Sequence, residues 1–298
     1  MADYRDLHDA RPEVQLELDE VGVAGLRRML DILDFDSAVY AFLSARISLP
    51  RHRKGAHTSR LIETINRSLE QERLSIRELS ERVVDGLLSY SVETKSASFE
   101  VRGECVLKRQ TPVQKKTSFE PYEFYYSLWR SKDGKAKTVM GVTVSGITLC
   151  PTVEWVVISG MREKLSGKLP TKEVEEMLSV LPAPSHTQRV KLDLRLERNG
   201  ELRLAFGELI DTVEKCIIPT FETLRVQEEL QLVEDAAARN PIWVEDAVRK
   251  LFRRLAVNER VSDDVRATVS GTVLDNIHKH EVVASSSRMM GEARKELG

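Results

Sequence analysis

The stretch that decides the fold runs from residue 97 to residue 149. It reads ASFEVRGECVL at 97–107, EPYEFYYSLWR at 120–130 and TVMGVTVSGITL at 138–149. Apolar and polar residues alternate in the first two segments, and the third is rich in Thr and Val, so all three are predicted strands. The turn sequence Lys132-Asp133-Gly134-Lys135 separates the second strand from the third. It predicts an antiparallel hairpin there.

Helices are predicted on both sides of this stretch. Those with apolar residues at helical spacing are 21–33, 59–69, 75–88, 171–181, 208–224, 228–238 and 241–256. Further strands are predicted at 37–49, 188–197 and 265–273. Strands and helices do not alternate as βαβ units in this order, so the expected class is α+β rather than a doubly wound parallel sheet.

Composition limits the classes of protein that the chain can be. Its 298 residues correspond to two domains at about 150 residues each. Hydrophobic residues make up 41% and charged residues 31%, which supports a sizeable core and excludes global disorder. The 45 Lys and Arg and the 47 Asp and Glu give a net charge of −2. No overall attraction to nucleic acid or to an anionic membrane is therefore expected.

Several features predict a cytoplasmic protein. Cys105, Cys150 and Cys216 are too few for a disulfide framework and fit a reducing compartment. The first residues are acidic and polar, so no signal peptide is expected. The longest uncharged run, 138–153, is shorter than the ~20 residues of a spanning helix, so no membrane insertion is expected. The sequence contains no GxGxxG, GxxxxGK[ST], GxSxG, HExxH or CxxC motif, which disfavours the corresponding enzyme and zinc classes.

Candidate metal ligands lie at predicted strand ends and in loops. Cys150 ends a strand, and most of the six histidines lie in loops or at element ends. His278 and His280 are two residues apart and would face the same side of an extended segment. A thiolate, imidazoles and carboxylates from separate loops can converge on one metal. The alternative is a buried cysteine with solvated histidines.

A basic segment precedes the helix that begins near Ser59. It contains Arg51, His52, Arg53, Lys54, His57 and Arg60. Basic side chains next to the free N–H groups of a helix N-terminus form a good anion site. The alternative is an ordinary solvated basic loop.

Several motifs resemble type IB GTP cyclohydrolases, including the archaeal-type enzymes. The stretch from Ile47 to Arg60 is similar to the family segment LP…KG-H-MSR, and VTVSGITLCP at 142–151 is similar to the strand that ends in the family's Cys-Pro. The remaining similar segments follow in the family's order: HTQR at 186–189, LIDTVE at 209–214, NPIWVED at 240–246 and DNIHKH at 275–280. The resemblance covers about residues 20–285.

The resemblance implies a tunnelling fold, in which antiparallel sheets carry helix pairs on one face. Two tandem modules and assembly as a homotetramer are also implied. The expected division is an N-terminal segment (1–20), a first module (21–150), a second module (151–285) and a polar, loose tail (286–298).

The resemblance also implies a metal-dependent site. One divalent metal, Zn, Fe(II) or Mn, would be held by Cys150, His186, Glu214 and His278. Glu229 is the best match for the family's purine-binding glutamate, with Glu228 next to it. Lys54, His57, Arg60 and Arg189 are the candidates for triphosphate contacts. His57, His280 and Asp275 are the catalytic candidates, the two histidines as proton carriers.

The implied reaction is hydrolysis of GTP. A metal-activated water would open the imidazole ring at C8, a second hydrolysis would release formate, and ring closure would give a dihydroneopterin phosphate. The expected partner is therefore GTP or a related purine nucleotide, serving pterin or folate biosynthesis.

The chain departs from the family near these positions. Where the family has Cys-Pro-Cys, this chain has Cys150-Pro151-Thr152. Where the family has Glu-Ser before Ile-His, this chain has Asp275-Asn276, and where the family has Lys-Arg-Pro-Asp-Glu, it has RVQEE at 225–229. Two alternatives follow. One is a diverged enzyme that stops at the formamidopyrimidine or uses another purine nucleotide; the other is a non-catalytic binding protein on the same fold.

Overall fold

The computed structural model describes residues 8, 10–70, 73–180, 185–239, 241–274 and 277–298. The strands are β1 (Leu18–Leu30), β2 (Val39–Leu49), β3 (Ser96–Gln110), β4 (Thr117–Ser131), β5 (Ala136–Leu149), β6 (Thr187–Asn199), β7 (Ile218–Pro219), β8 (Arg266–Leu274) and β9 (Glu281–Met289). The helices are α1 (Thr58–Leu69), α2 (Ile76–Leu88), α3 (Pro151–Leu165), α4 (Thr171–Val180), α5 (Phe206–Glu214), α6 (Val226–Arg239), α7 (Val244–Ala256) and α8 (Met290–Leu297).

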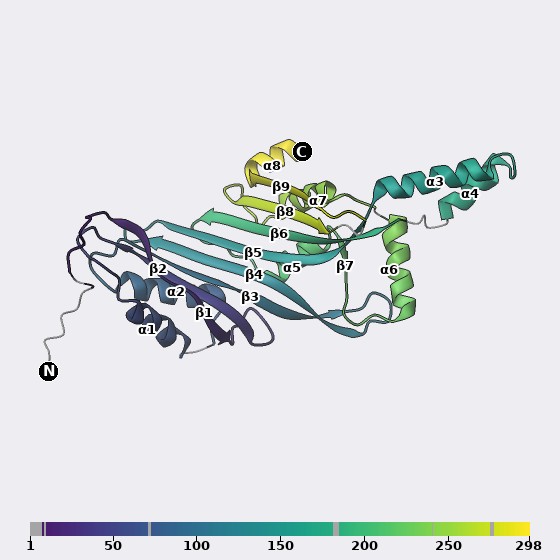
Figure 1. The fold of residues 1–298 in the computed structure, drawn as a ribbon. Coiled ribbons are helices and arrows are strands. Elements are labelled where there is room, and N and C mark those ends of the chain that lie inside the picture. Colours follow the sequence, from purple (N-terminus) through teal and green to yellow (C-terminus); the bar gives the residue numbers. More distant parts are fainter. Residues whose placement is uncertain (1–7, 9, 71–72, 181–184, 240, 275–276) are drawn as a thin grey trace.

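The strands form one antiparallel sheet in the order β1-β2-β3-β4-β5-β6-β8-β9 (Figure 1). A short turn joins β4 to β5, and Gly134 and Gly200 take positive φ values of 89° and 102° where β4 meets β5 and where β6 ends. The short strand β7 pairs with β5 at Gly146 and Ile147, beyond the last β4–β5 pair at Glu123 and Thr143. The predicted α+β class and the antiparallel sheet are confirmed.

One face of the sheet is covered by helices α1, α2, α5 and α7, which bury their apolar sides against it. Register places the buried side chains of neighbouring strands on that face: Val101 lies opposite Tyr126, and Tyr126 opposite Met140. Burial of this apolar layer is the main stabilising term of the fold. Phe35, Phe124 and Phe206 meet in its centre, with ring centroids 4.9 to 5.6 Å apart.

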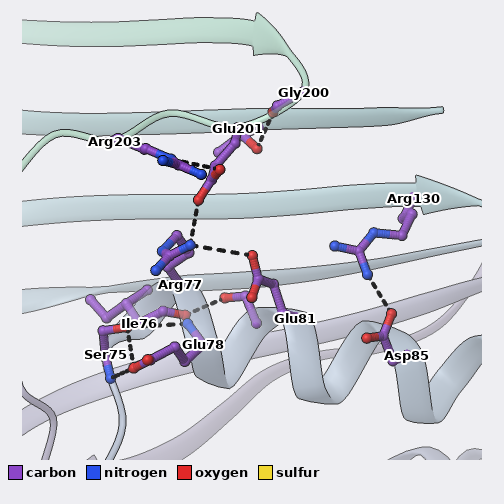
Figure 2. Close-up of polar contacts among 12 residues, drawn as sticks. Ser75, Ile76, Arg77, Glu78, Glu81, Asp85, Arg130, Gly200, Glu201 and Arg203 are labelled. Atoms are coloured by element: carbon purple, nitrogen blue, oxygen red, sulfur yellow. Dashed lines mark hydrogen bonds and ion pairs between the residues drawn. The ribbon is translucent and has the colours of Figure 1, made fainter. Parts of the chain in front are cut away.

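Polar contacts fix α2 against the rest of the molecule (Figure 2). Ser75 and Glu78 form a capping box at its N-terminus, which satisfies backbone N–H groups of the first turn. Arg77 pairs with Glu201 in the loop after β6, and Arg130 on β4 pairs with Asp85. These contacts join α2 to strands and loops that follow it by many residues in the sequence.

The opposite face of the sheet carries no helix among the described residues, and many of its side chains are polar. Arg46 pairs with Glu100 at 3.9 Å, and the Tyr125 hydroxyl donates to Glu100 at 3.3 Å. The Arg195 guanidinium lies 4.9 Å from the centre of the Tyr125 ring. This alternation of a buried and a polar face explains the period of two in the sequence.

The helix predicted at 21–33 is wrong, because these residues form most of strand β1. Its apolar residues Val23 and Leu26 are three apart, which is a helical spacing. In the structure a register shift between these two residues interrupts the pairing with β2. A bulge inserts an extra residue, so side chains three apart can return to the same face of a strand.

The loose tail predicted at 286–298 is also wrong. Residues 281–289 form the edge strand β9, and α8 follows directly. Met290 and Ala293 are buried, and Arg294 donates to the Ala256 carbonyl at 2.9 Å, which ties α8 to the end of α7. Two buried apolar residues in a polar segment were a weak sequence signal.

The order of elements repeats along the chain. β1-β2-α1-α2-β3-β4 is followed by β5-β6-α5-α7-β8-β9, with α3 and α4 inserted between β5 and β6, and β7 and α6 inserted between α5 and α7. The module boundary expected between residues 150 and 151 falls between β5 and α3. In the described part of the chain, no helix combines the length and the apolar character needed to cross a membrane.

Candidate functional site

A cavity of about 610 Å³ lies where β4 and β5 diverge and β7 takes the place of β4. Its walls include Tyr122 on β4, Ile147 on β5 and Arg189 on β6. The carboxylates that line it belong to Glu104, Glu120, Glu123, Glu214 and Glu222. Arg189 and Lys191 supply positive charge to the same walls. The cavity can therefore take a polar ligand with both basic and anionic groups.

Cys150 and His186 lie next to each other because β5 and β6 are paired to their ends. Leu149 faces Thr187 in the register, and one residue further the Cys150 N–H donates to the His186 carbonyl at 3.4 Å. The Ser185 hydroxyl donates to the Cys150 carbonyl at 2.8 Å. Cys150 is also the N-cap of α3, and Pro151 starts that helix without a donor to satisfy.

Glu214 is the last residue of α5 and lines the cavity. The Tyr122 hydroxyl donates to its Oε1, and the Arg109 Nη2 lies 3.2 Å from its Oε2. Arg109 also contacts Asp211 at 2.8 Å and donates from Nε to the Tyr122 oxygen at 3.1 Å. Burial raises the pKa of Glu214, and the Tyr122 hydrogen bond and the Arg109 charge oppose that shift. The carboxylate is therefore held in one position at the cavity wall.

His278 and His280 lie in the connection between β8 and β9. Their rings stack with centroids 5.0 Å apart, and both residues are exposed. Leu274 at the end of β8 pairs with Arg189, so this connection leaves the sheet at the same end as Cys150 and His186. The catalytic candidate Asp275 lies outside the described residues.

The four predicted metal ligands have the donor types that suit a soft divalent metal. Within one chain, Cys150 and His186 are neighbours through a backbone hydrogen bond. Among the described residues, no group of three or more His, Cys, Asp or Glu side chains is arranged to hold a metal ion. The donor chemistry fits a metal, while the side chains of a single copy are not gathered around one point.

The other two cysteines are buried. The Cys105 thiol lies 3.5 Å from the Tyr122 carbonyl oxygen, and Cys216 follows Glu214 by two residues. Burial raises the pKa of the Cys105 thiol to about 12 and that of Cys216 to about 11. Both thiols therefore stay protonated near neutral pH, and neither is a good metal ligand.

The predicted phosphate-binding segment lies at the start of α1. Lys54 and Arg60 are exposed, while His57 is buried with its ring 4.6 Å from that of His8. The Arg60 guanidinium lies 5.9 Å from the centre of the Tyr90 ring. Nearby, His52 and Arg53 contact Glu93 at 2.9 and 3.1 Å.

This segment and the cavity lie at opposite ends of the sheet. Leu49, which precedes the basic segment, ends β2 beside the start of β3, where Ser96 faces Ser131. β5 starts at that end, with Ala136 facing Arg130, and runs the length of the sheet to Leu149. Its 14 residues at ~3.3 Å each span ~45 Å. Within one chain, Lys54, His57 and Arg60 therefore do not meet Cys150 or Glu214, whereas Arg189 lines the cavity with Glu214.

The two candidate purine-binding glutamates differ in their surroundings. Glu228 is buried and accepts the Gln114 N–H at 2.9 Å and the Arg225 N–H at 3.4 Å. A hydrogen bond from Thr111 and these backbone donors lower the pKa of Glu228. Its carboxylate is thus engaged by the turn between β3 and β4. Glu229 is exposed, and neither residue is among those that line the cavity.

Sequence reasoning missed Arg109, Tyr122 and Asp211. Arg109 and Tyr122 come together only because β3 and β4 pair as a long hairpin. Asp211 precedes Glu214 by three residues, so both carboxylates share one side of α5. The spacing of Asp211 and Glu214 was visible in the sequence, but the contact of both carboxylates with Arg109 was not.

Comparison with known proteins agrees with the motifs. Residues 4–284 match the family described as Type I GTP cyclohydrolase folE2. GTP cyclohydrolase MptA 1 of Methanocella arvoryzae is 26% identical, over 98% of this chain and 96% of that protein. GTP cyclohydrolase MptA of Thermococcus kodakarensis is 29% identical, over 92% of this chain and 96% of that protein.

Solved structures show a weaker likeness. Uricase from Arthrobacter globiformis superposes with a TM-score of 0.49 and 9% identity, over 91% of this chain and 93% of that chain. A likeness at this level carries no argument about function. The family match spans nearly the whole chain, and on that match the chain belongs to the type I GTP cyclohydrolase family and is an enzyme that acts as a GTP cyclohydrolase.

Proposed function

We propose that this GTP cyclohydrolase is of type IB, has two tandem tunnelling-fold modules, and opens the purine imidazole ring at C8. The first water would give a formamidopyrimidine, and the second would release formate. Ring closure with the rearranged ribose would then lose one water and give a dihydroneopterin phosphate. The observation that carries the proposal is the cavity at the β4–β5 split. Glu214 and Arg189 line it, and it lies toward the end of the sheet where β5 and β6 meet Cys150 and His186.

The proposed metal ligands are Cys150, His186, Glu214 and His278. A divalent ion such as Zn, Fe(II) or Mn would supply Lewis acidity and a water of lowered pKa. The chain's own groups bind and orient the substrate. Arg189 would contact the phosphates, and Glu229 would bind the purine edge, since Glu228 is already engaged by the turn at Gln114.

His280 and His57 are the proposed proton carriers, and Asp275 is a further catalytic carboxylate. His280 shares the β8–β9 connection with His278, so it can serve the same end of the sheet. His57 lies at the opposite end, beside Arg60, in every copy. It can reach the site only if another copy of the chain supplies it.

We therefore propose that the site is composite. One copy would provide the cavity with Cys150, His186 and Arg189. A neighbouring copy would provide Lys54, His57 and Arg60 to bind the triphosphate. The ~45 Å span of β5 makes this division necessary if both sets act on one nucleotide. The proposal agrees with assembly as a homotetramer in the cytoplasm.

A product assay tests the reaction. The protein is incubated with GTP without oxygen in the presence of Mn²⁺, Fe²⁺ or Zn²⁺, and formate and pterin fluorescence are measured. Equal amounts of formate and fluorescent pterin are expected. Accumulation of a formamidopyrimidine without formate would instead identify an enzyme that stops at ring opening, and failure to retain any metal would contradict the metal site.

Mixing of inactive variants tests the composite site. Cys150→Ser and Arg60→Ala alter opposite ends of the sheet. If each site takes one end from each of two copies, mixed oligomers would contain some sites with neither change. Part of the turnover should return when the two variants are dissociated and reassembled together. The control mixture of Cys150→Ser with His186→Ala alters the same end twice and should stay inactive. A composite site is excluded if the first mixture also stays inactive although mixed oligomers form.

A further inference from the structure

The helices α3 and α4 form an arm that projects from the sheet (Figure 1). We call residues 151–180 the α3–α4 arm. Arg162 donates to Glu175 from two nitrogens, at 2.6 and 3.0 Å, and an isolated bridge joins Ser166 to Leu169 at the tip. The two helices are therefore held together as a preformed hairpin. α3 has no buried residue, and Val174 is the only buried residue of α4.

The surface of this arm is unusually apolar for one that water covers. The first part of α3, residues 151–161, has Glu154 as its only charged residue. Trp155 is 68% exposed and Val156 is 54% exposed. The other exposed apolar residues of the arm are Met161, Leu169, Met177 and Val180. A helix that is apolar around most of its circumference is normally covered on more than one side.

The exposed apolar side chains of the arm are of the kind that a protein interface buries. Monomeric proteins rarely expose contiguous apolar patches beyond a few hundred Å², and larger ones mark interaction sites. A stable protein interface buries ~800 Å² on each partner. A Trp side chain alone buries about 150–250 Å². Trp155 and the five exposed aliphatic or Met side chains therefore supply a substantial part of the area that a dimer contact needs.

We propose that the α3–α4 arm is a docking surface for a second copy of this chain. The proposal rests on the composite site described above, because that site needs a second copy at the Cys150 end. α3 begins directly after Cys150, so a copy whose Lys54 and Arg60 approach Cys150 must lie against the start of the arm.

The opposite end of the sheet, where the basic segment lies, offers exposed apolar residues to the arm. Val14, Leu16 and Val92 are all exposed there. Lys132 donates to the carbonyl of Val92 at 3.0 Å, and Glu93, the next residue, contacts Arg53 in the basic segment. Val92 thus lies beside the segment that the second copy would present. Val14 and Leu16 belong to the stretch between Ala10, whose carbonyl accepts the Lys54 N–H, and Glu17, which contacts Lys95. Each copy has one arm and one such surface, so symmetry can repeat the contact.

Sedimentation velocity on a charge variant tests the arm. Val156→Glu places a carboxylate on the apolar surface without touching the core of its own chain. The matched control is Val257→Glu, which alters a valine that is 78% exposed at the end of α7. We expect Val156→Glu to form smaller species than the wild type at equal concentration, with association weakened at least tenfold, ~1.4 kcal/mol. Val257→Glu should sediment as the wild type, and both variants should keep the wild-type circular dichroism spectrum.

A second variant tests the proposed partner surface. Val92→Glu should weaken association as Val156→Glu does, although the two residues lie toward opposite ends of the sheet in one copy. The arm proposal is overturned if the wild type is a monomer, or if Val156→Glu assembles as the wild type does. If Val156→Glu dissociates but Val92→Glu does not, the arm binds a different part of the second copy and the assigned surface is wrong. Sedimentation velocity does not depend on enzyme activity. The test of the arm is therefore unaffected if the wild type lacks the proposed C8 chemistry.

Discussion

At the scale of single residues, the clearest arrangement is the one around Glu214. Its carboxylate receives the Tyr122 hydroxyl and contacts Arg109, which also binds Asp211. Groups that hold a ligating side chain fix its orientation and commonly change metal affinity. Tyr122 and Arg109 are therefore positioning residues for Glu214, provided that Glu214 is a metal ligand as proposed.

Replacement of Tyr122 by Phe should weaken metal binding while the fold is kept. The change removes one hydroxyl, and loss of such a supporting group typically costs about 10–100-fold in metal affinity. Affinity can be measured by competition with a chromogenic chelator. Tyr125→Phe is the matched control, because Tyr125 lies on the other face of the sheet and its hydroxyl donates to Glu100. Equal metal affinity in the two variants would show that the Tyr122 hydroxyl does not position a ligand.

At the scale of elements, the long β3–β4 hairpin is tied to the start of α6. Glu228 accepts the Gln114 N–H of the turn, and the Glu222 N–H donates to Glu120 on β4 at 3.0 Å. These contacts hold the segment after β7 against the hairpin. That segment forms one wall of the cavity through Phe221 and Glu222. Loosening of the turn should therefore reach the site.

The stability contributed by Glu228 should depend on pH. Its pKa is lowered in the folded chain, because Thr111 and backbone donors favour the charged form. A lowered pKa adds stability above the unfolded-state value, near 4.5, and that stability is lost as the pH falls through the folded value. Glu228→Gln should thus be less stable than the wild type in urea at neutral pH. The difference should shrink on acidification below the range of an ordinary glutamate. A constant difference across this range would mean that the charge makes no contribution.

At the scale of the whole molecule, the two halves of the sequence share one core. Phe35 and Phe124 come from the first half, and Phe206 from the second. The sheet is also continuous from β1 to β9. Because both halves contribute to a single core and a single sheet, the chain should unfold in one cooperative transition.

Truncation of Phe206 tests this coupling. Phe206→Ala should cost ~3–5 kcal/mol of unfolding free energy, because it leaves a cavity between the two halves. Denaturation in urea, followed by circular dichroism and by tryptophan fluorescence, should still give coincident transitions. Phe119→Ala is the control, since that ring is exposed and its loss should cost much less. Two separate transitions in the wild type would contradict a shared core.

The sequence alone determined the family, the α+β class and most elements. Strands β3 to β6 and helices α1 and α2 were predictable because their residues alternate or repeat at the spacing of the element they form. Ser75 also signalled a helix start through its own side chain. The candidate residues Cys150, His186 and Glu214 came from motifs that are local in the sequence. Such features need no knowledge of distant contacts.

The tertiary structure decided what depends on pairing between distant segments. A bulge lets β1 form a strand although its apolar residues have a helical spacing. The helix α8 is held in place by a few buried residues. Glu228 was occupied by a turn more than a hundred residues away. The pairing of β5 across the sheet separated Arg60 from Cys150, which no local motif reveals. Strand register and burial are set by the whole chain, because each strand is stabilised by neighbours that the sequence does not place beside it.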